Sequence, residues 1–472
     1  MKVALISPPW KIFSPTPEVF LLNFAKGVFI SQEYAPKIVR KIKKAASYPL
    51  SLISVATSLL ERRKNDEVRI FDAEIEGQLM KKLRKFSPEL VGITTFTSPS
   101  LLWVYKLIEN VKNQLGAIII LGGPHVTLDP INSLKSCKAD FIIRGDGEIV
   151  FPQLLNFLDG KSRHIPKKGV AFRRENNIVA TPPFVADLSL LPIPNRDLYP
   201  PDKMGYQELN LETSRGCIFN CDFCYYSSIP SFHPWRSKPL FVIQKEIEEL
   251  QKYGIKRVFI VDNNFGIHKK RAIKVSKILS ENGMEWYAPI DVSHLDEKVI
   301  KSFSRHNCLN LYIGVETGYI KYTKIPSFSF LFSVIKGLMK NGITPITSYV
   351  LGRPGETRGE IFKTLKVAFK IHKLSLKYRK KREVSAMFDP CLFRPYPGTI
   401  LSKRLEESGI VLPKTVVGWG RLINDILTLR MERVNFTKNV TKKDMIRVLF
   451  AFAKMNLKDF IIPRIEEEIW KS

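Results

Sequence analysis

Apolar runs of strand length alternate with helical patterns over residues 1–160. Because these runs are apolar throughout, they predict a parallel sheet covered by helices on both faces. The ligands of such a flavodoxin- or Rossmann-like layer lie beyond the carboxyl ends of its strands. The predicted strands are Val3–Ile6, Val68–Phe71, Leu90–Thr94, Ala117–Leu121 and Phe141–Ile143.

The same alternation resumes after residues 161–205, a proline-rich segment that predicts a linker with one or two small strands. Six strand–helix units over residues 206–400 predict a partial (βα)6 TIM-like barrel, with functional loops at the carboxyl ends of its strands. Residues 401–472 lose the strand signal and predict a helical C-terminal domain. The predicted barrel strands are Leu209–Thr213, Arg257–Asp262, Glu285–Ile290, Asn310–Glu316, Pro345–Leu351 and Ser385–Phe393.

The composition is that of an ordinary globular protein, with 44% hydrophobic and 25% charged residues among 472. The formal net charge of +29 is compatible with an anionic partner or with solubility alone. The chain shows no membrane-spanning run and no signal-peptide pattern, so we expect a cytoplasmic protein. The apolar segment Met445–Ile462, which carries scattered basic residues, favours a core helix over a membrane-surface helix.

Three cysteines, Cys217, Cys221 and Cys224, follow the first predicted barrel strand. Their soft thiolates suit zinc or an iron–sulfur cluster. Zinc would require a fourth protein ligand, for which His233 is the candidate. Three cysteines alone would leave one iron of a four-iron cluster open to a small molecule, and the spacing favours this alternative.

The run Cys-x-x-x-Cys-x-x-Cys, with Phe223 before the third cysteine, resembles the signature of the radical SAM (S-adenosylmethionine) superfamily. Together with the first layer, it makes residues 1–400 similar to the cobalamin-binding class of that superfamily. The resemblance implies a 4Fe-4S cluster on Cys217, Cys221 and Cys224, SAM at the open iron and cobalamin on the first domain. In the superfamily that it resembles, an electron from the cluster splits SAM and releases a 5′-deoxyadenosyl radical.

The resemblance extends to three loops of the predicted barrel. Asp262 and Asn264 end the second strand, where the family's acidic loop accepts hydrogen bonds from the SAM ammonium. Glu316 ends the fourth strand and is expected near the SAM amino acid or ribose hydroxyls. Gly355 belongs to a Gly-x-Pro-Gly-Glu-Thr element that shapes the adenine side or simply makes a turn. SAM binding is thus expected at Phe223, Asp262, Asn264, Glu316 and Gly355.

The first layer lacks the Asp-x-His-x-x-Gly motif that places a histidine on cobalt. His125 instead belongs to a run that resembles the family's Gly-Gly-x-His-x-Thr loop, which contacts the corrin or its tail. Residues 145–148 resemble a Gly-Glu-Gly-Glu element, in which Glu148 has a ligand contact and a helix-capping role as equal alternatives. Cobalamin contacts are expected at Thr97, Ser98, Gly122, Gly123, His125, Thr127, Gly145 and Glu148.

These features predict a cobalamin-dependent radical SAM enzyme that methylates an unactivated carbon or phosphorus centre of a small-molecule or lipid-like substrate. Cyclisation or rearrangement is the alternative within the class, and a basic nucleic-acid-associated Fe-S protein is the alternative outside it. Nucleic acid is disfavoured because the chain has no RNA-binding module and no second cysteine cluster. We also expect an external electron donor of the flavodoxin or ferredoxin type, and peripheral membrane contact is compatible with the basic surface.

Overall fold

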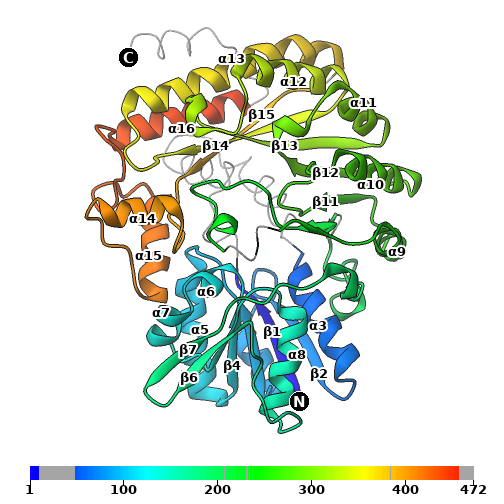
Figure 1. Cartoon of the computed structure of the whole chain (residues 1–472), viewed down its shortest axis with the longest axis vertical. Helices are drawn as coiled ribbons and strands as arrows, with labels where there is room; N and C mark the ends of the chain where they lie inside the picture. Colours follow the sequence, from blue (N-terminus) through cyan, green and yellow to red (C-terminus); the bar gives the residue numbers. More distant parts are fainter. Residues whose placement is uncertain (10–47, 207, 230–231, 233, 383, 457–472) are drawn as a thin grey trace.

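The computed structural model describes residues 1–9, 48–206, 208–229, 232, 234–382 and 384–456. Within these residues the chain forms two large, mainly parallel sheets, and the carboxyl edges of their parallel strands face each other across the middle of the molecule (Figure 1). The mixed α/β fold class predicted from the sequence is confirmed.

The first sheet has the strand order β2-β1-β3-β4-β5-β6-β7, of which the first five strands are parallel. Consecutive buried residues of β1 point to opposite faces, so Leu5 packs under α3 and α8 while Ile6 packs under α4 and α5. This two-sided burial explains why the strands are apolar throughout. The strands are β1 Lys2–Ser7, β2 Glu67–Asp72, β3 Leu90–Thr94, β4 Ile118–Gly122, β5 Phe141–Ile143, β6 Val170–Arg174 and β7 Asn177–Ala180. The helices are α3 Leu50–Arg62, α4 Leu79–Phe86, α5 Ser100–Leu115, α6 Pro124–Leu128, α7 Pro130–Ser136 and α8 Gly147–Leu158.

Strands β6 and β7 lie within the segment that the sequence predicts as a linker. They form an antiparallel hairpin that extends the first sheet beyond β5, rather than a free connection. The bounds 1–160 and 161–205 are a prediction, and the structure assigns residues 170–180 of the second range to the first sheet.

The second sheet has the order β15-β14-β13-β12-β11-β8, with every neighbouring pair parallel. Residues of β12 alternate between full burial under the outer helices, as at Trp286, and partial exposure inside the barrel, as at Tyr287. The strands are β8 Leu209–Leu211, β11 Arg257–Ile260, β12 Glu285–Ile290, β13 Cys308–Glu316, β14 Thr344–Leu351 and β15 Met387–Leu392. The helices are α9 Leu240–Gln251, α10 Lys269–Glu281, α11 Glu297–Arg305, α12 Phe328–Lys340 and α13 Arg358–Arg382. A two-stranded ribbon, β9 Ser214–Arg215 and β10 Arg236–Ser237, follows β8.

The described C-terminal residues are helical as predicted, and their helices pack on both halves of the molecule. They are α14 Ile400–Glu407, α15 Val416–Leu427 and α16 Lys442–Asn456. Helix α15 reaches down to α5 and α7 of the first layer (Figure 1), and the Val416 amide donates to Ser136 Oγ over 3.0 Å.

Helix α16 packs against α13 and β15, and Met445, Val448 and Phe452 are buried there. The core interpretation of this segment is thereby confirmed up to Asn456, while residues 457–462 lie outside the described residues. No helix in the described part of the chain is both long and apolar enough to cross a membrane.

Candidate functional site

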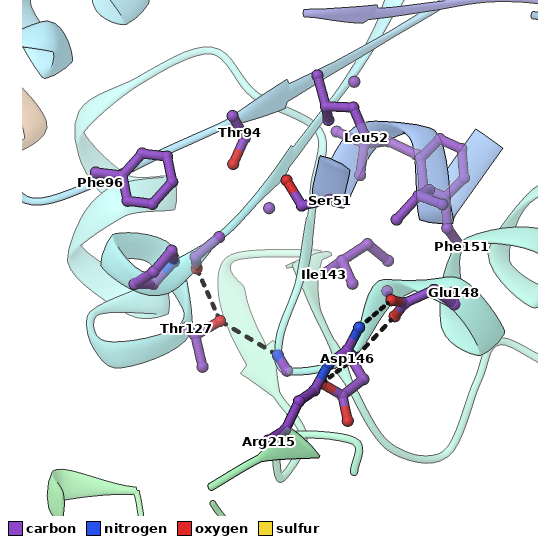
Figure 2. A pocket seen from close by; sticks show the side chains of 18 of the residues that line it. Ser51, Leu52, Thr94, Phe96, Thr127, Ile143, Asp146, Glu148, Phe151 and Arg215 are labelled. Carbon is purple, nitrogen blue, oxygen red and sulfur yellow. Dashed lines mark hydrogen bonds and ion pairs between the residues drawn. The ribbon is translucent and has the colours of Figure 1, made fainter. Parts of the chain in front are cut away.

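A pocket of about 300 Å³ opens at the carboxyl edge of the first sheet, between the two halves of the molecule (Figure 2). This volume lies at the lower end of the range for ligand pockets. Its floor comes from the first layer, at Gly92, Ile120 and Ile143, and its roof comes from the ribbon and the segment after the cysteines. The roof residues are Glu212, Arg215, Tyr225, Tyr226, Phe232 and Arg236.

Five of the eight predicted cobalamin residues line this pocket, and three do not. The lining residues are Gly122, Gly123, Thr127, Gly145 and Glu148. Thr97, Ser98 and His125 are not among the lining residues, and Thr97 and His125 are buried. The fully buried His125 places Nδ1 3.1 Å from Thr97 Oγ1 and packs against Trp419 of α15. Burial lowers the pKa of His125 to about 3, so its ring is neutral.

The glycines of these loops are glycine for different physical reasons. Gly123 (φ 97°) lies against the backbone, where a Cβ would stand 2.5 Å from the Thr95 carbonyl oxygen. Gly145 (φ 90°) has no room for a Cβ beside the Phe184 carbonyl. At Gly122 an added Cβ would meet no atom within 4 Å, so this glycine leaves open space that a large ligand can approach.

Thr127 ties two of these loops together. Its hydroxyl donates to the Gly123 carbonyl over 2.9 Å and accepts from the Gly145 amide over 3.2 Å (Figure 2). Both of its hydrogen bonds therefore go to the protein, and it shapes the pocket from within the wall.

Glu148 takes a role that neither sequence alternative names. It is buried at the start of α8, and its carboxylate receives the Arg215 Nη2 over 2.6 Å. Burial alone would lower the pKa of the Arg215 guanidinium, but Glu148, Glu212 and Asp146 outweigh burial and raise it well above its usual value. The side chain pairs with the ribbon of the second half, and it stands in the first turn of α8, where the helix has no side-chain capping hydrogen bond.

The cysteine loop lies between the two strands of this ribbon, and its thiols are half-buried. The pKa of Cys221 is raised to about 11, mainly by burial and also by the nearby thiols of Cys224 and Cys217, although the charge of Lys324 opposes the shift. The three thiols are thus close enough to influence one another electrostatically. The Ser227 hydroxyl interacts with the Cys221 and Cys224 carbonyls, 2.7 and 2.6 Å away, and so closes the loop.

Three soft thiols on one closed loop fit an iron–sulfur cluster, whose binding would displace their protons. Among the residues that the structure describes, no three His, Cys, Asp or Glu side chains are grouped to hold a single metal ion. The zinc alternative depended on His233, which lies outside the described residues.

Two of the predicted SAM residues are turned into the protein. The Asp262 carboxylate accepts from the amides and hydroxyls of both Thr213 and Ser214, over 2.5 to 3.0 Å. Asn264 Oδ1 accepts from the amides of Gly266 and Asp291. Both side chains stabilise loops at the carboxyl ends of barrel strands, where the sequence places them. Neither has a carboxylate or amide oxygen free to bind a ligand.

Glu316 faces the mouth of the barrel. Its backbone is left-handed (φ 65°), and its carboxylate folds back so closely over Gly314 that a Cβ there would collide with Oε1. Burial raises the pKa of Glu316 to about 7, although Lys324 and Arg353 oppose the shift. Gly318 closes the same loop against α13, where a Cβ would lie 2.5 Å from the Thr364 nitrogen.

Sequence analysis missed two cations beside this carboxylate. Arg353, the variable residue of the Gly-x-Pro-Gly-Glu-Thr element, donates Nη2 to both oxygens of Asp222 over 3.2 and 3.1 Å. Its guanidinium lies 5.7 Å from the Phe223 ring centroid, and its buried Nη1 has no partner among the described residues. Lys324 pairs with Asp291 over 3.1 Å. The position of Asp222 between two of the cysteines was the available signal for Arg353.

Gly355 serves the turn itself. It adopts φ 72°, and its amide donates to the Phe436 carbonyl over 2.8 Å. The adjoining Glu356 carboxylate accepts from the Gly352 and Arg353 amides, which accounts for the acid in this element.

Two family models match the chain. The B12 binding domain matches residues 38–155, and the Radical SAM superfamily matches residues 211–368. The two matches therefore fall on the first layer and on the barrel, on either side of the pocket.

An uncharacterized methyltransferase of Pyrococcus horikoshii is 29% identical, over 90% of this chain and 94% of its own length. The anaerobic magnesium-protoporphyrin IX monomethyl ester cyclase of Cereibacter sphaeroides is 23% identical, over 69% of this chain and 57% of its own length. Among solved structures, the radical S-adenosylmethionine methyltransferase TsrM from Kitasatospora setae, with cobalamin and a [4Fe-4S] cluster bound, superposes with a TM-score of 0.63. It shares 16% identity, over 86% of this chain and 78% of that one, and so shows the same fold.

Proposed function

The chain belongs to the cobalamin-binding radical SAM enzymes, and we propose that it methylates an unactivated carbon or phosphorus centre of a small-molecule substrate. One observation carries the proposal: the pocket of the B12-binding layer and the cysteine loop share a wall. Arg215, Tyr225 and Tyr226 line the pocket and also flank Cys217 and Cys224 in the sequence.

Cys217, Cys221 and Cys224 would hold the cluster, and the pocket lined by Gly122 would hold part of the corrinoid. When bound, the cluster supplies the electron that cleaves SAM, and the corrinoid carries the methyl group. Glu316 and Arg353 would bind the polar groups of SAM, since one is a buried carboxylate and the other has an unpaired buried donor at the barrel mouth.

A row of four aromatic rings packs beside the pocket, and three of them line it. The ring of Tyr225 lies 5.6 Å from Tyr396 and 4.5 Å from Tyr226, which in turn lies 5.8 Å from Phe232. These apolar faces would exclude water from a reaction that water would quench. The electrons would come from an external donor of the flavodoxin or ferredoxin type. Contact with a lipid surface would be a further property of the basic exterior.

Cyclisation is the second candidate, because one relative is a cyclase that covers more than half of this chain. The two reactions differ in their SAM products. Methyl transfer through a corrinoid yields S-adenosylhomocysteine in addition to 5′-deoxyadenosine, whereas a cyclase that uses only radical cleavage yields 5′-deoxyadenosine alone.

The test is anaerobic incubation of the reconstituted protein with SAM, hydroxocobalamin and a reductant, followed by measurement of both nucleosides. We expect both products from the wild type and from C137A, which alters a buried cysteine of the first layer. C217A should give neither product. A protein that binds iron and corrinoid but releases only 5′-deoxyadenosine would favour the cyclase, and one without a corrinoid absorption band would favour the nucleic-acid alternative.

A further inference from the structure

We propose that Arg215 is a positioning residue that fixes the cysteine loop in register with the pocket of the first layer, so that filling the pocket stabilises the cluster site. This inference rests on the proposed function, because it assumes that the pocket takes a corrinoid. It assigns a role to a charged cluster, formed by Asp146, Glu148, Glu212, Arg215 and Arg236, that none of the sequence motifs explains.

Arg215 stands two residues before Cys217 and directs its guanidinium at three carboxylates. Its Nε donates to Glu212 over 2.9 Å, Nη1 to Asp146 over 2.9 Å and Nη2 to Glu148 over 2.6 Å (Figure 2). Two of these acids belong to the first layer, Asp146 in the loop between β5 and α8 and Glu148 in the first turn of α8. A planar guanidinium with several donors fixes orientation as well as distance, which a lysine ammonium would not do.

A second arginine, on the neighbouring strand of the ribbon, also binds Asp146. Arg236 is the register partner of Arg215 in the β9–β10 ribbon, and its Nη1 donates to the other oxygen of Asp146 over 2.7 Å. The Ala186 amide donates to the same Asp146 oxygen over 2.7 Å. The Asp146 carboxylate is therefore held from three directions, and it holds both strands of the ribbon in return.

Both backbones that the charged cluster joins are themselves tightly placed. Gly145, beside Asp146, lies against the Phe184 backbone with no room for a side chain. Gly216, between Arg215 and Cys217, has φ 91° and would place a Cβ 2.6 Å from the Pro234 carbonyl oxygen. The Gly216 amide also donates to Asn263 Oδ1 over 3.0 Å. Because both backbones are tightly packed, a displacement of residues 145–148 would also displace Cys217.

Stability alone is a weak reason for this arrangement. The side chains of Arg215, Asp146 and Glu148 are 15%, 10% and 5% exposed, and buried ion pairs recover little more than their cost of desolvation. All five members of the charged cluster also line the pocket, so a ligand there rests against the groups that hold the cysteine loop.

The test measures iron loss from the reconstituted full-length protein to a chelator, with and without cyanocobalamin. In the wild type, saturating cyanocobalamin should slow iron release by about fivefold or more, the lower end of couplings between linked sites. R215K keeps the positive charge but loses the planar guanidinium. E148Q keeps the arginine and removes the negative charge of the carboxylate that Arg215 Nη2 contacts. Each variant is loaded with iron and compared at a cyanocobalamin concentration that saturates it. Both should then release iron at a rate that the corrinoid leaves unchanged.

R63K is the matched control, since Arg63 is a buried arginine that pairs with Asp66 and Asp159 and does not line the pocket. It should lose thermal stability and keep the full effect of cyanocobalamin. If cyanocobalamin binds and slows iron release equally in R215K, E148Q and the wild type, or leaves wild-type release unchanged, Arg215 has no positioning role. If the wild type does not bind cyanocobalamin, the proposed function itself fails, and this inference fails with it.

Discussion

Glu316 depends on a glycine two residues before it. Its carboxylate can fold over the strand only because position 314 has no Cβ. We expect G314A to displace this carboxylate and to weaken SAM binding roughly tenfold or more, the loss of one hydrogen bond to a charged group. Titration of the reconstituted protein with SAM measures the change.

G359A is the control for G314A, because a Cβ at that glycine would meet no atom within 4 Å. It should bind SAM like the wild type. Unchanged SAM affinity in a folded, iron-loaded G314A protein would remove Glu316 from the SAM site.

A second residue with a measurable consequence is Asp72, at the carboxyl end of β2. Burial raises its pKa from the usual 3.8 to about 6, although the Glu74 amide and the Tyr206 hydroxyl both donate to it. The folded protein therefore binds this proton more tightly than the unfolded chain. Stability from this group is full below about pH 4 and falls as the pH rises to about 6, by up to about 3 kcal/mol.

D72N should remove this penalty while keeping a hydrogen-bonding side chain. Relative to the wild type, its free energy of unfolding should rise by up to about 3 kcal/mol between pH 4 and pH 7, as measured by denaturant titration. Y206F removes a hydrogen bond that favours the charged form of Asp72. The Y206F protein should therefore lose more stability than the wild type as the pH rises from 4 to 7. A difference between D72N and wild type that does not change with pH would contradict the raised pKa.

The sequence assigns candidate residues to the strand ends that carry them. It predicts Cys217, Cys221, Cys224 and Glu316 at one barrel mouth. It could not tell which way Asp262 points, because the orientation depends on hydrogen bonds to Thr213 and Ser214, which are remote in the sequence. Arg353 was missed for the same reason, since its partner Asp222 is 131 residues away.

At the scale of elements, periodicity identified the parallel strands of both sheets, because each buries a continuous or alternating face. It could not show that β6 and β7 join the first sheet, nor which surface each C-terminal helix covers. Those choices are made by single contacts between distant segments, such as Gly420 of α15 against Leu102 of α5.

That contact gives a prediction for α15. A Cβ at Gly420 would lie 2.8 Å from Leu102 Cγ, so G420V should push the helix away from α5 and destabilise the protein by about 1–3 kcal/mol. Thermal unfolding measures the loss. Adding L102A should recover part of it, because the two changes act on one contact and are not additive. Full additivity of the two losses would show that α15 does not depend on this packing.

At the scale of the whole molecule, the pocket walls come from both halves. A ligand that binds there stabilises both halves by mass action, by about 2.7 kcal/mol at a hundredfold excess over its dissociation constant. We expect hydroxocobalamin to raise the midpoint of every calorimetric transition of the chain. A shift confined to one transition, with the others unchanged, would mean that the ligand contacts only the first layer.

The cysteine loop spans few residues, but its supports come from far along the chain. Asp146 and Glu148 hold it through Arg215, Asn263 through Gly216, and Arg353 and the Leu401 amide through Asp222. The motif is therefore not portable. A synthetic peptide with the same cysteine spacing, or a foreign barrel that received it as a graft, would lack this scaffold and should assemble clusters only transiently.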